Sequence, residues 1–385
     1  MSGSQRESQS AHKERVEKKA RAESSRVFRI SMLSGAKKIK GQGVASAYEE
    51  QVGLVKENIG EDFLVTEGGR PKADITHFHT INPSFYLYMF LKRRTGVRVG
   101  YVHLIPETVE RSLHIPKLFK KAFYKYMISF YRRMDRLVTV NPYFIGELVR
   151  YGADREKISY IPNYVSDKVF YRFDDERRRQ LREAFSIDPD AFVVVAAGQT
   201  QARKGVLDFV EVAKKMPNLT FVWAGGFSFG RITDGYEEIR KVMANPPANV
   251  RFLGIIDRTK MPEVYNLADV MFLPSFEELF PMTVLESMAC HIPILLRDLE
   301  IYEDILMDFY LKADSVDGFQ DILRSLSTDK KAWEAAAAAS TAGNHFYSRE
   351  HVFTMWDAFY RELVGAPIRS ATPPDHADNK TVLSS

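Results

Sequence analysis

The chain has 385 residues, of which 45% are apolar and 27% charged, and its formal net charge is +4. This length predicts two domains of ordinary size, each with its own core, and the composition excludes a wholly disordered protein. The small net charge does not by itself indicate nucleic-acid binding, and no window approaches the roughly 20 apolar residues of a membrane span. The single cysteine, Cys290, is typical of a reducing compartment.

Residues 1–26 are polar and charged throughout. They lack the apolar segment of a secretory signal, so we expect a disordered tail on a protein that is cytosolic or peripheral to a membrane. The alternative is a basic arm that touches a membrane.

Residues 27–170 alternate apolar strand patterns with helical ones. The first strand, Val27–Leu33, is followed by a glycine-containing loop and a helical pattern over Val44–Lys56. Further strands are predicted at Ile75–Phe78, Arg98–Val102, Leu137–Val140 and Ile158–Ile161. Such alternation is typical of a parallel, doubly wound sheet, and predicts an N-terminal Rossmann-like domain over 27–170.

Residues 171–345 repeat this architecture after a charged linker and first helix within 166–190. The predicted strands are Phe192–Ala197, Thr220–Ala224, Val250–Phe252, Val270–Leu273 and Pro293–Leu296. The predicted helices are Val206–Lys215, Glu237–Val242, Met261–Leu267 and Thr283–Ala289. An apolar face with helical spacing within 346–366 predicts a C-terminal amphipathic helix that packs back on a domain surface. Residues 367–385 are expected to be disordered.

Two carboxylates flank a predicted helix start in the second domain. Glu278 lies in the loop after a strand, and Glu286 lies on the helix that follows. Backbone N–H groups at a helix N-terminus bind anions, so the first turn, with Phe280, Met282 and Thr283, is expected to face a diphosphate. Carboxylates accept hydrogen bonds from paired sugar hydroxyls. The alternative is an acidic loop before a core helix.

Two basic residues follow another predicted strand of this domain. Arg203 and Lys204 precede a predicted helix, where their charge suits a diphosphate leaving group. The alternative is a solvated pair of basic residues.

These segments together resemble a known family. Pro274-Ser275, Glu278 and Leu285–Ala289 resemble the E-x7-E signature of retaining GT-B glycosyltransferases of family 4, which implies two Rossmann-like domains facing a cleft. The resemblance implies that Glu278 contacts the donor sugar and Glu286 the ribose. Leu279 and Pro281 depart from the glycines that are usual there.

The segment Ala197–Gly205 resembles the family's G-R…K-G element. Lys204 matches its lysine, whereas Gln199 replaces the usual arginine and Arg203 is expected to compensate. Weaker matches imply further substrate contacts from Gly41 and Gly43, and from Gly226 and Ile256 in the base and phosphate pocket. Gly100–His103 resembles the strand that ends in a histidine contacting the donor sugar, so we give His103, Lys204 and Glu278 catalytic roles.

The only Asp-x-Asp pattern is Asp188-Pro189-Asp190. Its position just before a strand, with proline between the two carboxylates, favours a turn over a metal site. We therefore predict no required metal and no cofactor besides the donor substrate.

Residues 115–136 combine aromatic and basic side chains at helical spacing, as amphipathic helices on anionic membranes do. The residues expected to contact the membrane are Lys117, Lys120, Lys121, Phe123, Lys125, Arg132 and Arg133. The alternative is a core-packed helix with solvated lysines. No nucleic-acid motif accompanies the patch, so we expect no nucleic-acid partner.

The chain also resembles bacterial glycosyltransferases that build diglycosyl-diacylglycerol glycolipids, in Lys40–Val44, His79–Pro83, Gly100–His103, Phe123–Tyr126, Trp223–Gly230 and Glu278–Met282. The resemblance implies transfer of a hexose from UDP-glucose or UDP-galactose to a diacylglycerol glycolipid, monoglucosyl-diacylglycerol. It also implies a cytoplasmic protein, peripheral on the inner face of the cell membrane.

The residues leave three rival interpretations open. The first is a soluble transferase for a polysaccharide or small metabolite, and the second is a sugar-nucleotide epimerase of the same fold. The third is a non-catalytic membrane protein, against which Glu278, Glu286 and Lys204 argue together.

Overall fold

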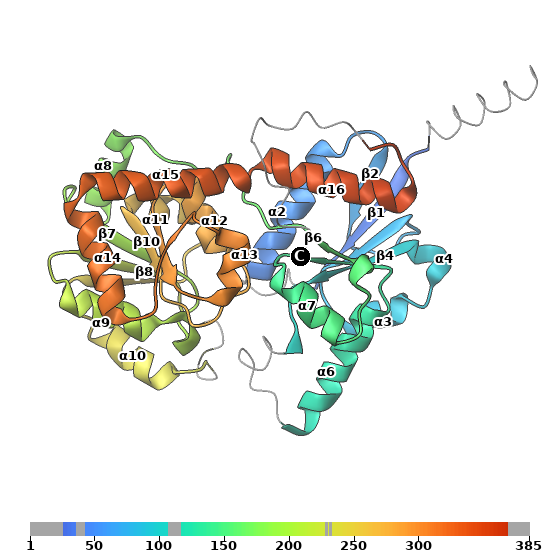
Figure 1. The fold of residues 1–385 in the computed structure, drawn as a ribbon, viewed down its shortest axis with the longest axis horizontal. Helices are drawn as coiled ribbons and strands as arrows, with labels where there is room; N and C mark the ends of the chain where they lie inside the picture. Colours follow the sequence, from blue (N-terminus) through green and yellow to red (C-terminus); the bar gives the residue numbers. More distant parts are fainter. Residues whose placement is uncertain (1–25, 36–42, 107–116, 228–229, 231–232, 369–385) are drawn as a thin grey trace, which may run out of the picture.

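The structure is a computed structural model that describes residues 26–35, 43–106, 117–227, 230 and 233–368. The predictions for the tail before residue 26 and for Gly41 fall outside these residues, as does the predicted disorder beyond Ile368. Two parallel six-stranded sheets, each flanked by helices, form the two halves of the molecule (Figure 1).

The first sheet has the strand order β2-β1-β3-β4-β5-β6. Its elements, with their helices, are β1 (Phe28–Leu33), α2 (Gly43–Asn58), β2 (Phe63–Glu67), β3 (Ile75–Phe78), α3 (Pro83–Tyr88), α4 (Lys92–Thr95), β4 (Val97–Val102), α6 (Lys117–Arg132), β5 (Arg136–Thr139), α7 (Tyr143–Arg150) and β6 (Ile158–Tyr160).

The second sheet has the order β12-β11-β10-β7-β8-β9. Its elements are α8 (Asp175–Ala184), β7 (Val193–Ala197), α9 (Val206–Lys215), β8 (Thr220–Ala224), α10 (Tyr236–Ala244), β9 (Val250–Gly254), α11 (Met261–Leu267), β10 (Val270–Leu273), α12 (Met282–Ala289), β11 (Ile294–Arg297), α13 (Glu303–Leu306), β12 (Leu311–Ala313), α14 (Val316–Thr328), α15 (Lys330–Phe346) and α16 (Arg349–Val364).

The central strands follow directly from the sequence. Every residue of β7, Val193–Ala197, is buried, as expected for a parallel strand covered on both faces. The predicted bounds of β3, β8, β10, α9 and α11 are confirmed residue by residue. The sequence patterns did not indicate the edge strands β2 and β12, which are short and partly exposed, nor the helices α14 and α15.

Each sheet has a point where the direction of winding reverses. In the second sheet this point lies between β7 and β10, which pair directly although β8 and β9 come between them in the chain. In the first sheet it lies between β1 and β3. Ligands of doubly wound sheets bind beyond the carboxyl ends of the strands at such points. The topology therefore directs attention to the loops after β7 and β10.

The C-terminal helix α16 packs on the first domain, whereas α15 before it covers the second (Figure 1). The predicted apolar face is confirmed, with Val352, Trp356 and Tyr360 buried. The Tyr360 hydroxyl lies 2.8 Å from Nδ1 of His77 on β3 and accepts a hydrogen bond from Gln51 on α2 at 3.2 Å. Two polar groups in the first domain's core thus depend on the last helix of the chain.

We predict that Tyr360→Phe lowers the free energy of unfolding by about 1–3 kcal/mol, because it leaves buried polar groups of His77 and Gln51 without their shared partner. Urea denaturation measures the effect. The control is Tyr143→Phe, at a residue that is 41% exposed, which should change stability by less than about 0.5 kcal/mol. Equal midpoints for the two variants would show that the Tyr360 contacts do not stabilise the fold.

Candidate active site

The loops after β7, β8 and β9 come very close together at the end of the second sheet. The Gly225 backbone N–H donates to the carbonyl of Gly254 at 2.8 Å, and Gly198 N–H donates to Ala224 at 2.9 Å. A Cβ on Gly225 would lie 1.7 Å from the Gly198 carbonyl oxygen, so only glycine fits there. These loops therefore meet backbone to backbone at this end of the sheet.

Lys204 and Glu278 meet at the reversal point between β7 and β10. The Lys204 ammonium forms a hydrogen-bonded ion pair with Oε1 of Glu278, and the two side chains are only 12% and 6% exposed. Burial lowers the pKa of Lys204, an effect that Glu278 opposes and Arg203 reinforces. The two residues singled out from separate motifs are therefore in contact.

Gly205 allows this contact. It adopts a left-handed conformation with φ of 72° between the short helix at Ala202–Lys204 and α9. A Cβ at this position would lie 2.2 Å from the carbonyl oxygen of Pro274, just after β10. The loop that carries Lys204 is thereby packed against the loop that carries Glu278.

The first turn of α12 lies directly after Glu278. Its N-cap residue, Pro281, makes no side-chain capping hydrogen bond, so the turn's amides are not capped from that position. The Thr283 hydroxyl is buried with no partner among the described residues, and Phe280 and Met282 are buried beside it. Arg203 approaches from the other loop, its Nη1 3.4 Å from the carbonyl of Glu277. The positive charge of Arg203 and Lys204 beside a helix N-terminus suits a diphosphate.

Glu286 lies one helical turn deeper and is buried. The Tyr265 hydroxyl donates to its Oε2 at 2.6 Å, and Arg258 lies 3.7 Å from its Oε1. Burial raises the pKa of Glu286 to about 7, although Arg258 and Tyr265 act in the opposite direction. This carboxyl therefore titrates near neutral pH.

The remaining predicted donor contacts lie around the same loops. Gln199 accepts a hydrogen bond from the side chain of Gln201 at 2.8 Å. Gly226 faces the neighbouring loop, where a Cβ would lie 2.9 Å from Cγ1 of Ile255, and Ile256 packs partly against the core. Gly43, by contrast, is the first residue of α2 in the other domain.

His103 belongs to a separate cavity in the first domain. It follows β4 and, with His79 and Tyr101, lines a cavity of about 270 Å³ at the end of the sheet. Burial lowers the pKa of His103 to about 4 and that of His79 well below its usual value, so both rings are neutral. Nε2 of His103 and both ring nitrogens of His79 have no partner among the described residues. No described hydrogen bond or ion pair joins His103 to Lys204 or Glu278.

Two contacts between the domains were not predicted. Nδ2 of Asn141, just after β5, donates to the carbonyls of Leu279 at 2.9 Å and Ile301 at 3.0 Å. Arg258 pairs with Glu50 of α2 at 2.5 Å as well as lying near Glu286. The only sequence signal was their position, since polar side chains just beyond strands β5 and β9 face the cleft edge of a doubly wound sheet.

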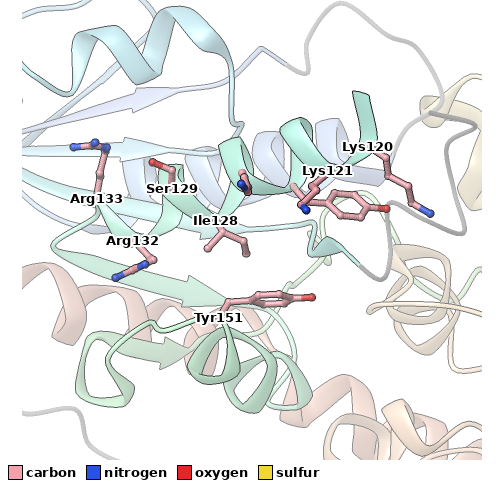
Figure 2. Close-up of a pocket in the computed structure, with 9 residues that line it drawn as sticks. Lys120, Lys121, Ile128, Ser129, Arg132, Arg133 and Tyr151 are labelled. Carbon is pink, nitrogen blue, oxygen red and sulfur yellow. The ribbon is translucent and has the colours of Figure 1, made fainter. Parts of the chain in front are cut away.

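Helix α6 exposes Lys121, Lys125 and Arg132, whereas its described aromatic residues are half-buried or buried. A groove of about 820 Å³ lies between α6 and Tyr151, and Figure 2 shows the side chains that line it. The groove is lined by Lys120, Lys121, Tyr124, Lys125, Ile128, Ser129, Arg132, Arg133 and Tyr151. Phe130 is buried, and Phe123 and Tyr126 pack against the domain core. These three aromatic side chains contact protein, and Lys117 is described only as the first backbone position of α6.

Asp188 and Asp190 form the predicted turn, in which the Asp190 N–H donates to the Asp188 carboxylate at 3.0 Å. Within the described ranges, no group of three or more His, Cys, Asp or Glu residues is placed to hold a metal ion. No helix within these ranges is long and apolar enough to span a membrane.

Two family descriptions match this chain. "Glycosyltransferase Family 4" matches residues 63–168, and "Glycosyl transferases group 1" matches residues 177–344. The chain is 43% identical over 335 residues to an alpha-galactosylglucosyldiacylglycerol synthase of Streptococcus pneumoniae, covering 87% of this chain and 90% of that protein. The chain belongs to the family 4 glycosyltransferases.

Two further proteins are similar to this glycosyltransferase, one in sequence and one in fold. It is 29% identical over 268 residues to a processive diacylglycerol alpha-glucosyltransferase of Acholeplasma laidlawii, covering 70% of this chain and 78% of the relative. The crystal structure of Anabaena Alr3699/HepE in complex with UDP and glucose superimposes with a TM-score of 0.68, at 14% identity, and covers 88% of this chain and 100% of that chain. This structural similarity confirms the predicted two-domain GT-B fold.

We predict that the KM of the glycosyltransferase for its nucleotide-sugar donor falls as the pH rises from about 6 to about 8. The raised pKa of Glu286, about 7, means that the carboxyl loses its proton in this range, and the ionised form accepts stronger, charge-assisted hydrogen bonds from hydroxyls. Initial rates across this range measure the effect. Glu286→Gln should flatten the profile, and the surface control Glu263→Gln should not. A pH-independent KM in the unsubstituted enzyme would contradict the assignment of Glu286 to the donor site.

Proposed function

We propose that this glycosyltransferase moves a hexose, with retention of configuration, from UDP-galactose or UDP-glucose to monoglucosyl-diacylglycerol. The observation that carries the proposal is the 43% identity, across 87% of the chain, to a relative named for the galactosylglucosyldiacylglycerol product. That name favours UDP-galactose. The Acholeplasma relative, a diacylglycerol glucosyltransferase, supports UDP-glucose as the second candidate donor.

The donor is assigned to the cleft edge of the second sheet. Lys204, Arg203 and the first turn of α12 bind the diphosphate. The glycines that follow β7 and β8 let the diphosphate come close to the backbone. Glu278 accepts hydrogen bonds from the transferred hexose, and Glu286 from the ribose. Gln199, Gly226 and Ile256 complete the nucleotide pocket.

The acceptor hexose is assigned to the cavity in the first domain. Its volume of about 270 Å³ suits one sugar ring, and the neutral rings of His79 and His103 offer nitrogens without partners among the described residues. Neutral imidazoles donate or accept hydrogen bonds with hydroxyls according to tautomer. His103, which lines this cavity, is also assigned to orient the donor hexose.

In the reaction, the acceptor hydroxyl attacks the anomeric carbon from the face that the diphosphate leaves. The bond between the anomeric carbon and the acceptor oxygen forms as the bond to the diphosphate breaks, and the hydroxyl proton passes to the departing phosphate oxygen. Lys204 and Arg203 stabilise the negative charge that develops on the diphosphate. Closure of the two domains excludes water from the site.

The protein is proposed to work at the inner face of the cell membrane. The exposed lysines and arginines of α6 attract an anionic surface at roughly 1 kcal/mol for each residue near it. The groove in Figure 2 presents this charge on the domain that also holds the acceptor cavity. A lipid-linked acceptor therefore reaches the site from that side.

We predict that Lys204→Ala lowers kcat by a factor of about 10²–10³, because it removes a charge that acts on the leaving group. UDP release at saturating donor measures the loss. The matched control, Lys215→Ala, removes a lysine that is 45% exposed and should leave kcat unchanged. Thermal unfolding verifies that the variant is folded, since Glu278 loses its buried partner. Near-normal turnover in a folded Lys204→Ala enzyme would overturn the assignment.

The proposed function is tested by UDP release from UDP-galactose and UDP-glucose, with vesicles that contain or lack monoglucosyl-diacylglycerol. We expect release that requires the glycolipid, together with a new two-sugar lipid detected by mass, and faster release from UDP-galactose. Donor consumption without acceptor would contradict the proposal and favour an epimerase or a hydrolase. Equal transfer to water-soluble sugars would favour a soluble transferase.

A further inference from the structure

Three large apolar side chains are exposed together at the corner between α3 and α4. Leu87, Phe90 and Leu91 are 70%, 57% and 51% exposed, and we call them the apolar corner. No other stretch of five described residues exposes three large apolar side chains. Their combined exposed area is roughly 300 Å², a size at which apolar patches on soluble proteins are commonly functional.

The apolar corner lies against α6. The hydroxyl of Tyr86 on α3 lies 2.8 Å from the Ser129 hydroxyl on α6 and accepts a hydrogen bond from Nε of Arg133 at 2.8 Å. The Arg133 guanidinium also lies 5.1 Å from the centre of the Phe90 ring. The corner and the basic groove of α6 therefore form one continuous surface.

The charge around the apolar corner has a single sign. Residues 79–106 contain four lysines and arginines and no acidic residue, and residues 117–134 contain six and no acidic residue. Arg93 and Arg94, which follow Leu91 closely, are exposed. Exposed apolar side chains rimmed by basic ones match the boundary between the acyl chains and head groups of an anionic bilayer.

None of the described large apolar side chains of helix α6 is as exposed as those of the apolar corner. The buried aromatic residues of α6 pack into the domain, and Tyr126 donates a hydrogen bond to the carbonyl of Ile81. The exposed side chains of α6 are mainly charged, and salt screens their attraction to lipid. The apolar corner is therefore the larger described source of a contact that survives high salt.

We infer that the apolar corner inserts into the interface of an anionic bilayer and is the salt-resistant part of the membrane contact. This inference rests on the proposed function and deepens it, because it names the segment that meets the lipid. Helix α3 begins at Pro83, in the wall of the acceptor cavity, and carries Leu87 near its other end. A helix of this length spans about 9 Å, so insertion of the corner holds the cavity close to the bilayer surface.

The test compares the full-length protein with Leu87→Ser/Phe90→Ser/Leu91→Ser in sedimentation with phosphatidylglycerol vesicles, at about 0.05 M and about 1 M salt. The unsubstituted protein is expected to keep measurable binding at high salt. The triple variant should lose at least about tenfold in partition coefficient at high salt and less at low salt, where charge still contributes. Lys121→Gln/Lys125→Gln/Arg132→Gln should show the reverse pattern.

The matched control is Leu64→Ser/Val169→Ser, which removes side chains 46% and 40% exposed on other parts of the surface and should bind as the unsubstituted protein does. Unchanged partitioning of the triple variant would overturn the inference. If the triple variant partitioned as before but had a lower molar mass in analytical ultracentrifugation without vesicles, the corner would instead be an interface between two copies of the chain.

Activity separates this inference from the proposed function. With a short-chain, monomeric glucosyl-diacylglycerol as acceptor, the triple variant should match the unsubstituted enzyme, while with vesicles it should be at least about tenfold slower at high salt. Loss of activity on both acceptors would contradict a role confined to the membrane. If the unsubstituted enzyme used neither acceptor, the proposed function would fail, and partitioning would still decide the role of the apolar corner.

Discussion

The buried ion pair between Lys204 and Glu278 sets the geometry on which the rest of the site depends. Two opposite charges are held at the reversal point of the second sheet, on loops that come from β7 and β10. Desolvation of both groups is costly, so such a pair is weak evidence of stabilisation. Its position beyond the strand ends, beside the first turn of α12, is instead what a site for an anionic sugar nucleotide requires.

The relation between the domains depends on a small number of polar contacts. Asn141 of the first domain donates to the backbone at Leu279, the residue next to Glu278. Arg258 of the second domain reaches Glu50 of α2 while lying beside Glu286. Each of the two carboxylates assigned to the donor is therefore adjacent to a contact with the other domain. The proposed donor site therefore lies beside the residues that hold the two domains together.

The central strands were predictable because their signal is local. Runs such as Val193–Ala197 are buried on both faces, and a continuous apolar run shows this directly. The edge strand β2 (Phe63–Glu67) was not predicted, because one side of an edge strand faces solvent and the burial of β2 along the chain is irregular. Lys204 and Glu278 were found through family motifs. Asn141 was not, since its partners lie 138 and 160 residues away and one polar residue after a strand carries little signal.

The aromatic face of α6 shows a different limit of prediction from sequence. Helical spacing identified one apolar side but could not say whether it meets protein or lipid, and the packing of Tyr126 and Phe130 shows that it meets protein. The apolar corner of α3 was overlooked for the complementary reason. Leu87, Phe90 and Leu91 lie among buried neighbours such as Tyr88 and Met89, so the sequence does not reveal which of these apolar residues are exposed.

The central claim is that the donor binds with its diphosphate at Lys204 and its sugars at the two glutamates. A crystal structure of the protein with UDP-galactose tests this most directly. We expect the diphosphate within hydrogen-bond distance of Lys204 and the first turn of α12, the hexose at Glu278 and the ribose at Glu286. A nucleotide that bound elsewhere and contacted neither Lys204 nor Glu278 would contradict the account.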